Sequence, residues 1–403
     1  MTKFQRSGKS RLLAMLIAVL MCAMTLFSGC GGQSGSAGTA SGGGDTANAE
    51  GGTQAAPEIA GLTYTEEMPL ERAEGFSVYR YESGYSLIDI HDHQRFLVIP
   101  EGGSAPEGLD EDIVCLQRPV SRIYLAATAT MALFCSMDAI GNIRMSSIKE
   151  DAWTFDEPKK AMQAGDIIYA GKYSAPDYET MLDEGCDLAV ESTMIDHTPE
   201  VKEMIEDLGI PVLIDRSSYE NDPMGRAEWI RLYGVLTGHE EEADAFFEEQ
   251  MGSIRDLDDF ENTGRTVAFF YITSDGKVVA RASTDYVPKM IEMAGGKYIF
   301  SDLTNDDARS SVDMSVETFF DAAADADIII YNTSIDGSVK TLEDLAARDP
   351  VMKNMKAVKE GNCWATGSSM YQRTDLAAEM ILDFHKLLTE DDPQDMKYIE
   401  KLD

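Results

Sequence analysis

The chain has 403 residues and carries 71 Asp and Glu against 34 Lys and Arg, which gives a formal net charge of −37 at pH 7. A surface this acidic repels nucleic acid phosphates and anionic lipid headgroups, so both are excluded as partners of the folded part. The six cysteines are widely spaced and form neither the CxxC pairs of zinc sites nor a disulfide framework. One disulfide stays open among Cys115, Cys135, Cys186 and Cys363.

Residues 1–29 have the pattern of a secretory signal peptide. A basic stretch is followed by an apolar run over residues 12–27 and by the small residues Ser28 and Gly29. Cys30 comes next, and this arrangement resembles the lipobox of bacterial lipoproteins, in which the cysteine is acylated. Phe27 departs from the usual small aliphatic residue. The alternative is an uncleaved membrane anchor, because the run reaches the lower limit of the about 20 residues that span a bilayer. Either way, we expect an extracytoplasmic protein that touches the cell membrane through its anchor only.

Residues 30–60 are rich in Gly, Ser and Ala and predict a flexible linker between the anchor and a folded body. Residues 75–100 alternate apolar and polar side chains around the sequence HDHQ, which predicts a β-hairpin. His91 and His93 flank its turn. Two such histidines could share a metal ion, but a polar turn explains them without one.

From residue 118 onward, short apolar runs alternate with amphipathic stretches. This pattern predicts parallel sheets covered by helices on both faces, that is, an α/β fold. In chain order, we expect strands at 121–127, 143–148, 166–171, 187–192 and 210–215, with helices at 130–140, 176–185 and 199–209 between them. Further strands are expected at 265–273, 277–282 and 327–332, an extended piece at 357–366, and helices at 285–296, 316–326 and 373–388.

A helical pattern over residues 223–257 separates the two groups of strands. The predicted organisation is therefore an N-terminal lobe with a β-hairpin extension (61–222), one long interlobe helix (223–257) and a C-terminal lobe (258–403). Gly238 and the capping-box pattern of Thr237 and Glu240 allow a kink or a break in that helix.

The order of these segments resembles the class III solute-binding proteins of ABC importers, which carry ferric siderophores, haem or cobalamin. The matching sequences are RPVSRIYLAATATMALFCSMDAI, YAGKYSAPDYETMLDEGCDLAVEST, AGGKYIFSDL, SVETFFDAAADADIII and AVKEGNCWAT, spread over residues 118–389 with a helical segment in the middle. No single motif is specific; their order carries the likeness. Residues 62–110 lie outside the family's usual pattern.

The resemblance implies a monomeric receptor without enzymatic activity or cofactor, which delivers a small-molecule metal chelate to an ABC permease and its ATPase. It also assigns two permease-docking carboxylates, Glu179 in SAPDYETML and Glu317 in MSVETFF. Charges on the two lobes would fix the orientation on the partner. In a chain this acidic, both could equally be solvated surface residues.

Ligands of open α/β sheets bind beyond the carboxyl ends of the strands. The candidate ligand-binding residues that follow strands are Thr128, Lys172, Tyr173, Thr193, Met194, Arg216 and Tyr219 in the first lobe, and Arg281, Tyr286, Asn332, Met370, Tyr371 and Arg373 in the second. Thr130, Ser192, Thr273, Asp285 and Gln372 are close to the same ends. The cations among these residues favour an anionic ligand, and the tyrosines suit a conjugated or catecholate one. The arginines could instead pair with neighbouring acids.

We therefore expect capture of an iron complex, such as a ferric siderophore-like chelate, between the lobes. Haem or a corrinoid is the alternative, for which Met194, Met370 or Tyr371 could donate an axial ligand. A receptor for free zinc or manganese ions is less well supported, because such a site needs converging side-chain ligands and the chain has only five scattered histidines. An enzyme is disfavoured, since the sequence has no GxSxG, Walker or HExxH motif.

Overall fold

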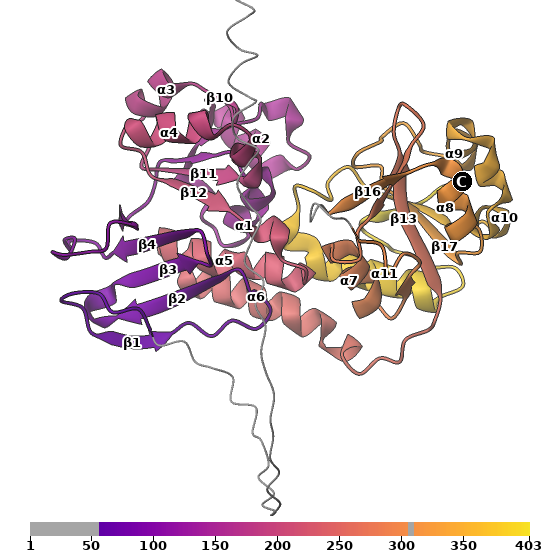
Figure 1. Ribbon diagram of the computed structural model, residues 1–403, viewed down its shortest axis with the longest axis horizontal. Coiled ribbons are helices and arrows are strands. Elements are labelled where there is room, and N and C mark those ends of the chain that lie inside the picture. Colours follow the sequence, from indigo (N-terminus) through magenta and orange to yellow (C-terminus); the bar gives the residue numbers. More distant parts are fainter. Residues whose placement is uncertain (1–55, 305–309) are drawn as a thin grey trace, which may run out of the picture. The chain divides into compact units, whose positions relative to one another are not determined.

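The computed structural model describes residues 56–304 and 310–403 (Figure 1). The signal peptide, Cys30 and the linker up to residue 55 lie outside the described residues. Within the described range the protein is an α/β structure with parallel strands covered by helices, which confirms the expected fold class.

The N-terminal extension is a five-stranded sheet, which is larger than the expected hairpin. Its strands are β1 (Tyr64–Glu67), β2 (Phe76–Tyr81), β3 (Ser86–Ile90), β4 (Gln94–Ile99) and β5 (Ile113–Gln117), paired in chain order. The β3–β4 hairpin, with its turn at residues 91–93, is the predicted one. Residues 100–112 then return the chain so that β5 pairs with β4 in parallel. Leu87 and Leu97 face a small core of their own, whereas Val78 and Ile88 join the main core, so both faces are buried.

The first lobe contains a five-stranded parallel sheet in the order β12-β11-β6-β7-β8. The strands are β6 (Ile123–Leu125), β7 (Ile143–Ser146), β8 (Ile168–Tyr169), β11 (Leu188–Ser192) and β12 (Val212–Asp215). The helices are α1 (Met131–Ser136), α2 (Asp156–Ala164), α3 (Tyr178–Asp183) and α4 (Pro199–Asp207), and β9 (Gly171–Lys172) and β10 (Ala175–Pro176) form a small hairpin. Apolar residues of α1 pack with one face of the sheet, and those of α3 and α4 with the other.

Two helices replace the single long interlobe helix of the prediction. α5 (Pro223–Thr237) begins at the N-cap Asp222 and ends where Gly238 adopts the left-handed conformation at φ 82°. α6 (Glu240–Ile254) then folds back along α5, with Arg231 of α5 paired to Asp244 and Glu248 of α6. The prediction of one continuous helix is therefore wrong, and the break that the glycine allowed is present.

The second lobe has a mixed sheet in the order β16-β14-β13-β17-β18-β19, with β15 also paired to β13. Only β15, β13, β17 and β18 run parallel. The strands are β13 (Thr266–Ile272), β14 (Val278–Arg281), β15 (Lys297–Tyr298), β16 (Ser311–Met314), β17 (Ile328–Tyr331), β18 (Cys363–Thr366) and β19 (Ile399–Lys401). The helices are α7 (Tyr286–Met293), α8 (Val316–Ala323), α9 (Leu342–Arg348), α10 (Lys356–Glu360) and α11 (Ala377–Thr389). The piece expected to be extended at 357–366 is the helix α10 followed by β18.

Two further observations concern the cysteines and the possibility of a membrane-spanning helix. Cys115, Cys135, Cys186 and Cys363 are free thiols, so no disulfide joins them. In the described part of the chain, none of the helices combines the length and the apolar character needed to cross a bilayer.

The first lobe buries one carboxyl group without a hydrogen-bond partner. Glu191 of β11 is fully buried, two residues after Ala189 and therefore on the face that packs against α3 and α4. Neither of its carboxylate oxygens has a partner in the described structure. Burial raises the pKa of Glu191 to about 8, because the charged form is poorly solvated in an apolar core.

Glu191 should make the protein less stable as the pH rises. Between its pKa in the unfolded chain and about pH 8, the folded state keeps a proton that the unfolded state releases, so folding is penalised increasingly across this interval. The Glu191→Gln variant should lose this dependence, which is worth on the order of 3–5 kcal/mol at pH 9. Urea unfolding from pH 5 to pH 9 measures it. The exposed control Glu203→Gln should keep the wild-type profile, and an unchanged profile in Glu191→Gln would contradict the account.

Candidate functional site

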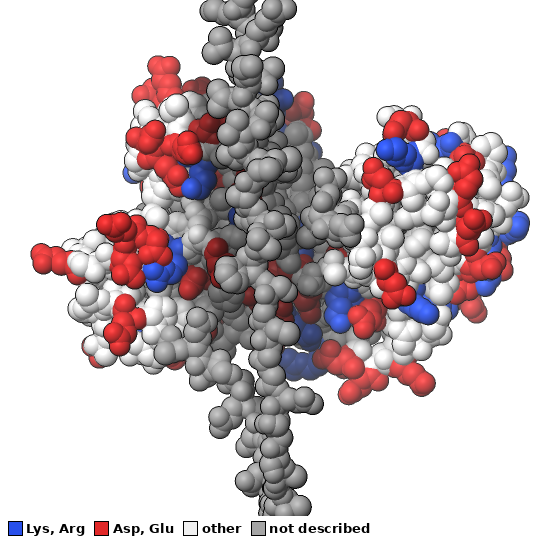
Figure 2. Space-filling view, in the orientation of Figure 1, with Lys and Arg blue, Asp and Glu red and all other residues white. Residues whose placement is uncertain are grey.

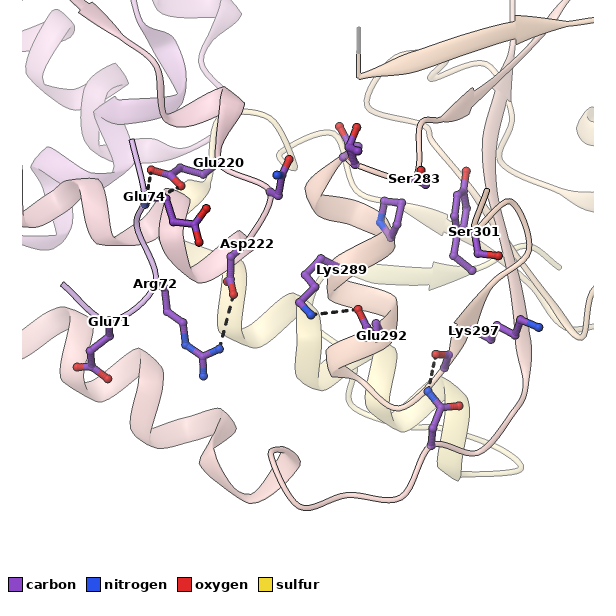
Figure 3. Close-up of a pocket in the computed structure, with 17 residues that line it drawn as sticks. Glu71, Arg72, Glu74, Glu220, Asp222, Ser283, Lys289, Glu292, Lys297 and Ser301 are labelled. Carbon is purple, nitrogen blue, oxygen red and sulfur yellow. Dashed lines mark hydrogen bonds and ion pairs between the residues drawn. The ribbon is translucent and has the colours of Figure 1, made fainter. Parts of the chain in front are cut away.

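A cavity with a volume of about 890 Å³ lies between the two lobes (Figure 3). One wall comes from residues 71–74 of the extension and from residues 220–222, which precede α5. The other comes from residues 283–285, from α7 and from residues 296–301. This volume lies within the range of about 300–1,000 Å³ typical of small-molecule sites.

Two buried glutamates hold the extension against α5. We call residues 69–75 the strap. Glu228 accepts hydrogen bonds from the backbone N–H groups of residues 71, 72 and 73 at 2.7–2.8 Å. Glu220 accepts from residues 74 and 75 and from Nε1 of Trp229 at 2.8–3.0 Å. Because five consecutive amides are satisfied in this way, the strap is fixed as one wall of the cavity.

The backbone of the strap also lies too close to α5 to leave room for a side chain there. A Cβ atom at Gly225 would be 2.7 Å from the carbonyl oxygen of Arg72. At its other end, Nδ1 of His91 lies 2.8 Å from the carbonyl oxygen of Glu74. Both ring nitrogens of His91 in the β3–β4 turn thus contact protein groups, the hydroxyl of Ser77 and the carbonyl oxygen of Glu74.

The cavity is polar, and most of its charged groups already have structural partners. Six carboxylates and three cations line it. Asp222 caps α5 and pairs with Arg72 at 3.6 Å, and Asp285 caps α7 through the N–H of Val287. Lys289 pairs with Glu292 at 3.1 Å. In Figure 3 the pairs Arg72–Asp222 and Lys289–Glu292 lie on opposite sides of the cavity.

Three residues predicted from strand ends of the second lobe come together beside this cavity. The guanidinium of Arg281 donates to the hydroxyl of Tyr371 and lies 5.4 Å from its ring centroid. Nδ2 of Asn332 donates to the same hydroxyl at 2.6 Å. Arg281 also pairs with Asp285 at 3.6 Å, and Asp285 lines the cavity. Burial raises the pKa of Asp285, and the charge of Arg281 opposes that rise.

Arg226 belongs to the same region and was missed by sequence reasoning. Its guanidinium stacks on Tyr286 with 3.9 Å to the ring centroid, and its buried Nε has no hydrogen-bond partner in the described structure. Among the described residues, no carboxylate lies within 4.0 Å of it. A small cavity of about 20 Å³ next to Arg226 is lined by Tyr286, Met370 and Arg373. In the structure Arg226 is the one residue of α5 outside the buried set, but the strand-end rule used on the sequence does not consider residues inside helices.

Residues 370–373 join the two lobes. Oε1 of Gln372 accepts from the N–H of Thr154 at 2.8 Å, and its Nε2 donates to the carbonyl of Ala152 at 2.9 Å. Arg373 forms two 2.8 Å hydrogen bonds with Asp375 and lies over the ring of Phe155. Arg373 is therefore largely neutralised by a protein partner.

The candidates from the first lobe do not join this group. Arg216 pairs with Asp196 at 3.3 Å and lies 6.0 Å from the ring of Tyr219, which is 63% exposed. Lys172 is exposed on the β9–β10 hairpin, and Tyr173 packs against the α3–α4 core. The four cations predicted to bind the ligand therefore do not share one site. Arg281 and Arg373 lie next to residues 371–372, whereas Arg216 pairs with Asp196 and Lys172 is exposed on the β9–β10 hairpin.

The remaining first-lobe candidates lie in short helical turns after their strands. Thr128 begins the turn that leads into α1, and Thr193 and Met194 begin the turn after β11. Met194 is 47% exposed. None of these three lines the large cavity.

The two predicted docking glutamates occupy equivalent positions in their helices. Glu179 and Glu317 are each the second residue of a helix, α3 and α8, behind the N-caps Asp177 and Ser315. Both are exposed. Hydrogen bonds, first with backbone N–H and then with Ser315, lower the pKa of Glu317. On the face shown in Figure 2, acidic side chains gather over α3 and α4.

Comparison with known proteins decides the family. A profile described as "Periplasmic binding protein" matches residues 146–369, more than half of the chain. The chain belongs to the periplasmic binding protein family. This confirms the resemblance stated from the sequence. The chain is accordingly a substrate-binding protein of the ABC-transporter type, and its family is one of solute-binding transport proteins rather than of enzymes.

Curated relatives share sequence with this chain, and solved structures share its fold. An uncharacterized lipoprotein of Methanocaldococcus jannaschii is 25% identical over 311 residues, which cover 73% of this chain and 72% of that protein. The fold is similar to that of a possible iron-binding periplasmic solute-binding protein from Staphylococcus epidermidis (TM-score 0.53, 15% identity, 68% of this chain and 100% of that one). It is also similar to that of a periplasmic heme-binding protein from Vibrio cholerae (TM-score 0.53, 16% identity, 65% and 97%).

Proposed function

We propose that this protein is the lipid-anchored, extracytoplasmic receptor of an ABC importer and that it captures a ferric siderophore-like chelate between its lobes. The observation that carries the proposal is the interlobe cavity of about 890 Å³ in a member of the periplasmic binding protein family. A cavity of this volume is much larger than a bare metal ion needs and suits an organic complex.

The lining of the cavity favours a hydrophilic chelate over haem or a corrinoid. Nine of its residues are charged, and Ser283, Thr284 and Ser301 add hydroxyl groups, whereas the only rings among its lining residues are those of Pro288 and Tyr298. A large planar macrocycle would need apolar walls on both of its faces. Two of the side chains considered as axial donors are also engaged, since Tyr371 is bound by Arg281 and Asn332, and Met370 is buried.

Arg226 is the cation best suited to meet a negatively charged edge of the chelate. Arg281 and Arg373 already pair with carboxylates, but among the described residues no carboxylate forms an ion pair with Arg226. Tyr286 beneath it holds the guanidinium plane in place and adds a flat aromatic surface. Small hinge or shear movements between the lobes would bring a bound chelate against this pair.

Arg226→Gln should weaken the binding of an anionic ferric chelate by about 5- to 150-fold, which corresponds to about 1–3 kcal/mol for a charge-assisted hydrogen bond. The measurement is a fluorescence or calorimetric titration with a panel of catecholate, carboxylate and hydroxamate ferric chelates, haem and cobalamin. Arg255→Gln, an exposed arginine of the turn after α6, is the matched control and should bind like the wild type.

The proposal would be contradicted by equal affinities of the Arg226 and Arg255 variants for every anionic chelate. Binding of haem or cobalamin together with rejection of all ferric chelates would replace the proposed ligand by the alternative one.

Glu179 and Glu317 are proposed to dock onto the permease. Changing both to Lys should leave chelate affinity nearly unchanged, because both side chains are exposed and neither lines the cavity. Import should nevertheless fall sharply, since like charges at a protein interface cost several kcal/mol.

Uptake of ⁵⁵Fe-labelled chelate by cells that carry the variant as their only copy measures this effect. The control is Glu200→Lys with Glu343→Lys, which changes the exposed second residues of α4 and α9 and adds the same charge. Normal uptake by the Glu179 and Glu317 double variant would show that both are ordinary solvated acids.

The anchor is proposed to be a diacylglyceryl group on Cys30. Mass spectrometry of protein extracted from membranes should find residues 1–29 removed and a lipid-modified cysteine at the new N-terminus. Cys30→Ser should release the protein from the membrane fraction. An intact signal on the purified wild-type protein would contradict lipid anchoring and would favour a membrane-spanning anchor instead.

A further inference from the structure

We propose that the strap is part of the ligand site and that Glu71 and Glu74 select chelates carrying a positively charged group. The inference rests on the proposed function, because it concerns the same cavity. Glu71, Arg72 and Glu74 line that cavity, and residues of α7 line it on the opposite side (Figure 3). They belong to the N-terminal extension, which lies outside the part of the chain matched by the family profile at 146–369.

The strap has the rigidity that a binding wall needs. Five of its backbone N–H groups donate hydrogen bonds to Glu220 and Glu228. Glu220 is 6% exposed and Glu228 is fully buried. The side chains of residues 71, 72 and 74 therefore project from a backbone that is already ordered before any ligand arrives. Little conformational entropy is then lost when a ligand binds against them.

Of the six carboxylates that line the cavity, Glu71 and Glu74 are those without an ion-pair partner among the described residues. The carboxylates of Glu220, Asp222 and Asp285 are satisfied by backbone amides, helix caps or arginines. Glu292 pairs with Lys289.

By contrast, Glu71 and Glu74 are exposed, and no side chain of the described residues forms an ion pair with either of them. Figure 3 shows the carboxylate of Glu74 pointing from the strap into the space in front of α7.

Two unpaired carboxylates on a fixed wall create a negative potential at that end of the cavity. A ligand with an ammonium or other cationic group there gains a charge-assisted hydrogen bond, whereas a ligand with an anionic group is repelled. The opposite requirement holds beside Arg226, whose guanidinium stacks on Tyr286 next to the lining residue Asp285. The substrate class that fits both groups is a hydrophilic ferric chelate with a free amine on one side and an acidic or iron-binding oxygen edge on the other.

The experiment uses two probes that differ in one charge: a ferric trihydroxamate bearing a free primary amine, and the same chelate with that amine acetylated. The wild-type protein should bind the amine form about tenfold more tightly, and the preference should shrink in high salt. The double variant Glu71→Gln/Glu74→Gln should bind both forms with nearly equal affinity. The control Glu66→Gln/Glu67→Gln removes the same charge from the exposed strand β1 and should keep the wild-type preference.

Equal binding of the two forms by the wild-type protein, or an unchanged preference in the Glu71 and Glu74 variant, would overturn the role of the strap and leave the proposed function intact. Binding of neither form would overturn the inference, and the chelate panel described above would then decide separately whether the proposed ferric-chelate ligand stands. Because each comparison is a ratio of affinities measured on one protein, a general loss of stability in a variant would not imitate the expected result.

Discussion

The arrangement of the interlobe cavity depends on two buried carboxylates, Glu220 and Glu228, which accept hydrogen bonds from five consecutive backbone N–H groups of the strap. A carboxylate withdrawn from water is costly unless all of its acceptor sites are used, and here they are used by amides that would otherwise be unsatisfied. The contact joins residues about 150 positions apart in the chain and ties the extension to α5. Through it, a segment outside the residues matched by the family profile becomes one wall of the interlobe cavity.

The helix that carries Glu228 is kept short by the glycine at its C-terminal end. A single helix over residues 223–257 would project about 50 Å at 1.5 Å per residue, well beyond the strap and the sheets that flank it. Gly238 ends α5, and α6 returns beside it, with Arg231 held between Glu228 on one helix and Asp244 and Glu248 on the other. The helical hairpin thus supplies both the platform for the strap and the connection between the lobes.

Sequence patterns predicted the fold class, the parallel first lobe and most helix positions, because apolar periodicity reports local structure directly. They did not report strand direction, so the antiparallel strands β14 and β16 were not foreseen. The strand-end rule found Arg281, Asn332 and Tyr371, which the fold joins across up to 90 residues.

The rule names an edge of a sheet but not the direction of a side chain, and therefore it also chose Lys172 and Arg216. Arg226 was not predicted because it lies inside a helix and not at a strand end. The strap was not predicted because its hydrogen-bond partners are distant in the sequence.

The central claim is that the ligand binds in the interlobe cavity, and the anomalous scattering of its iron can locate it. Crystals of the protein grown with a bound ferric chelate should give one anomalous-scattering peak at the iron absorption edge, located between the strap and α7 and flanked by the Arg226–Tyr286 pair. A peak on the outer surface of either lobe, such as at the β9–β10 hairpin, would contradict the account.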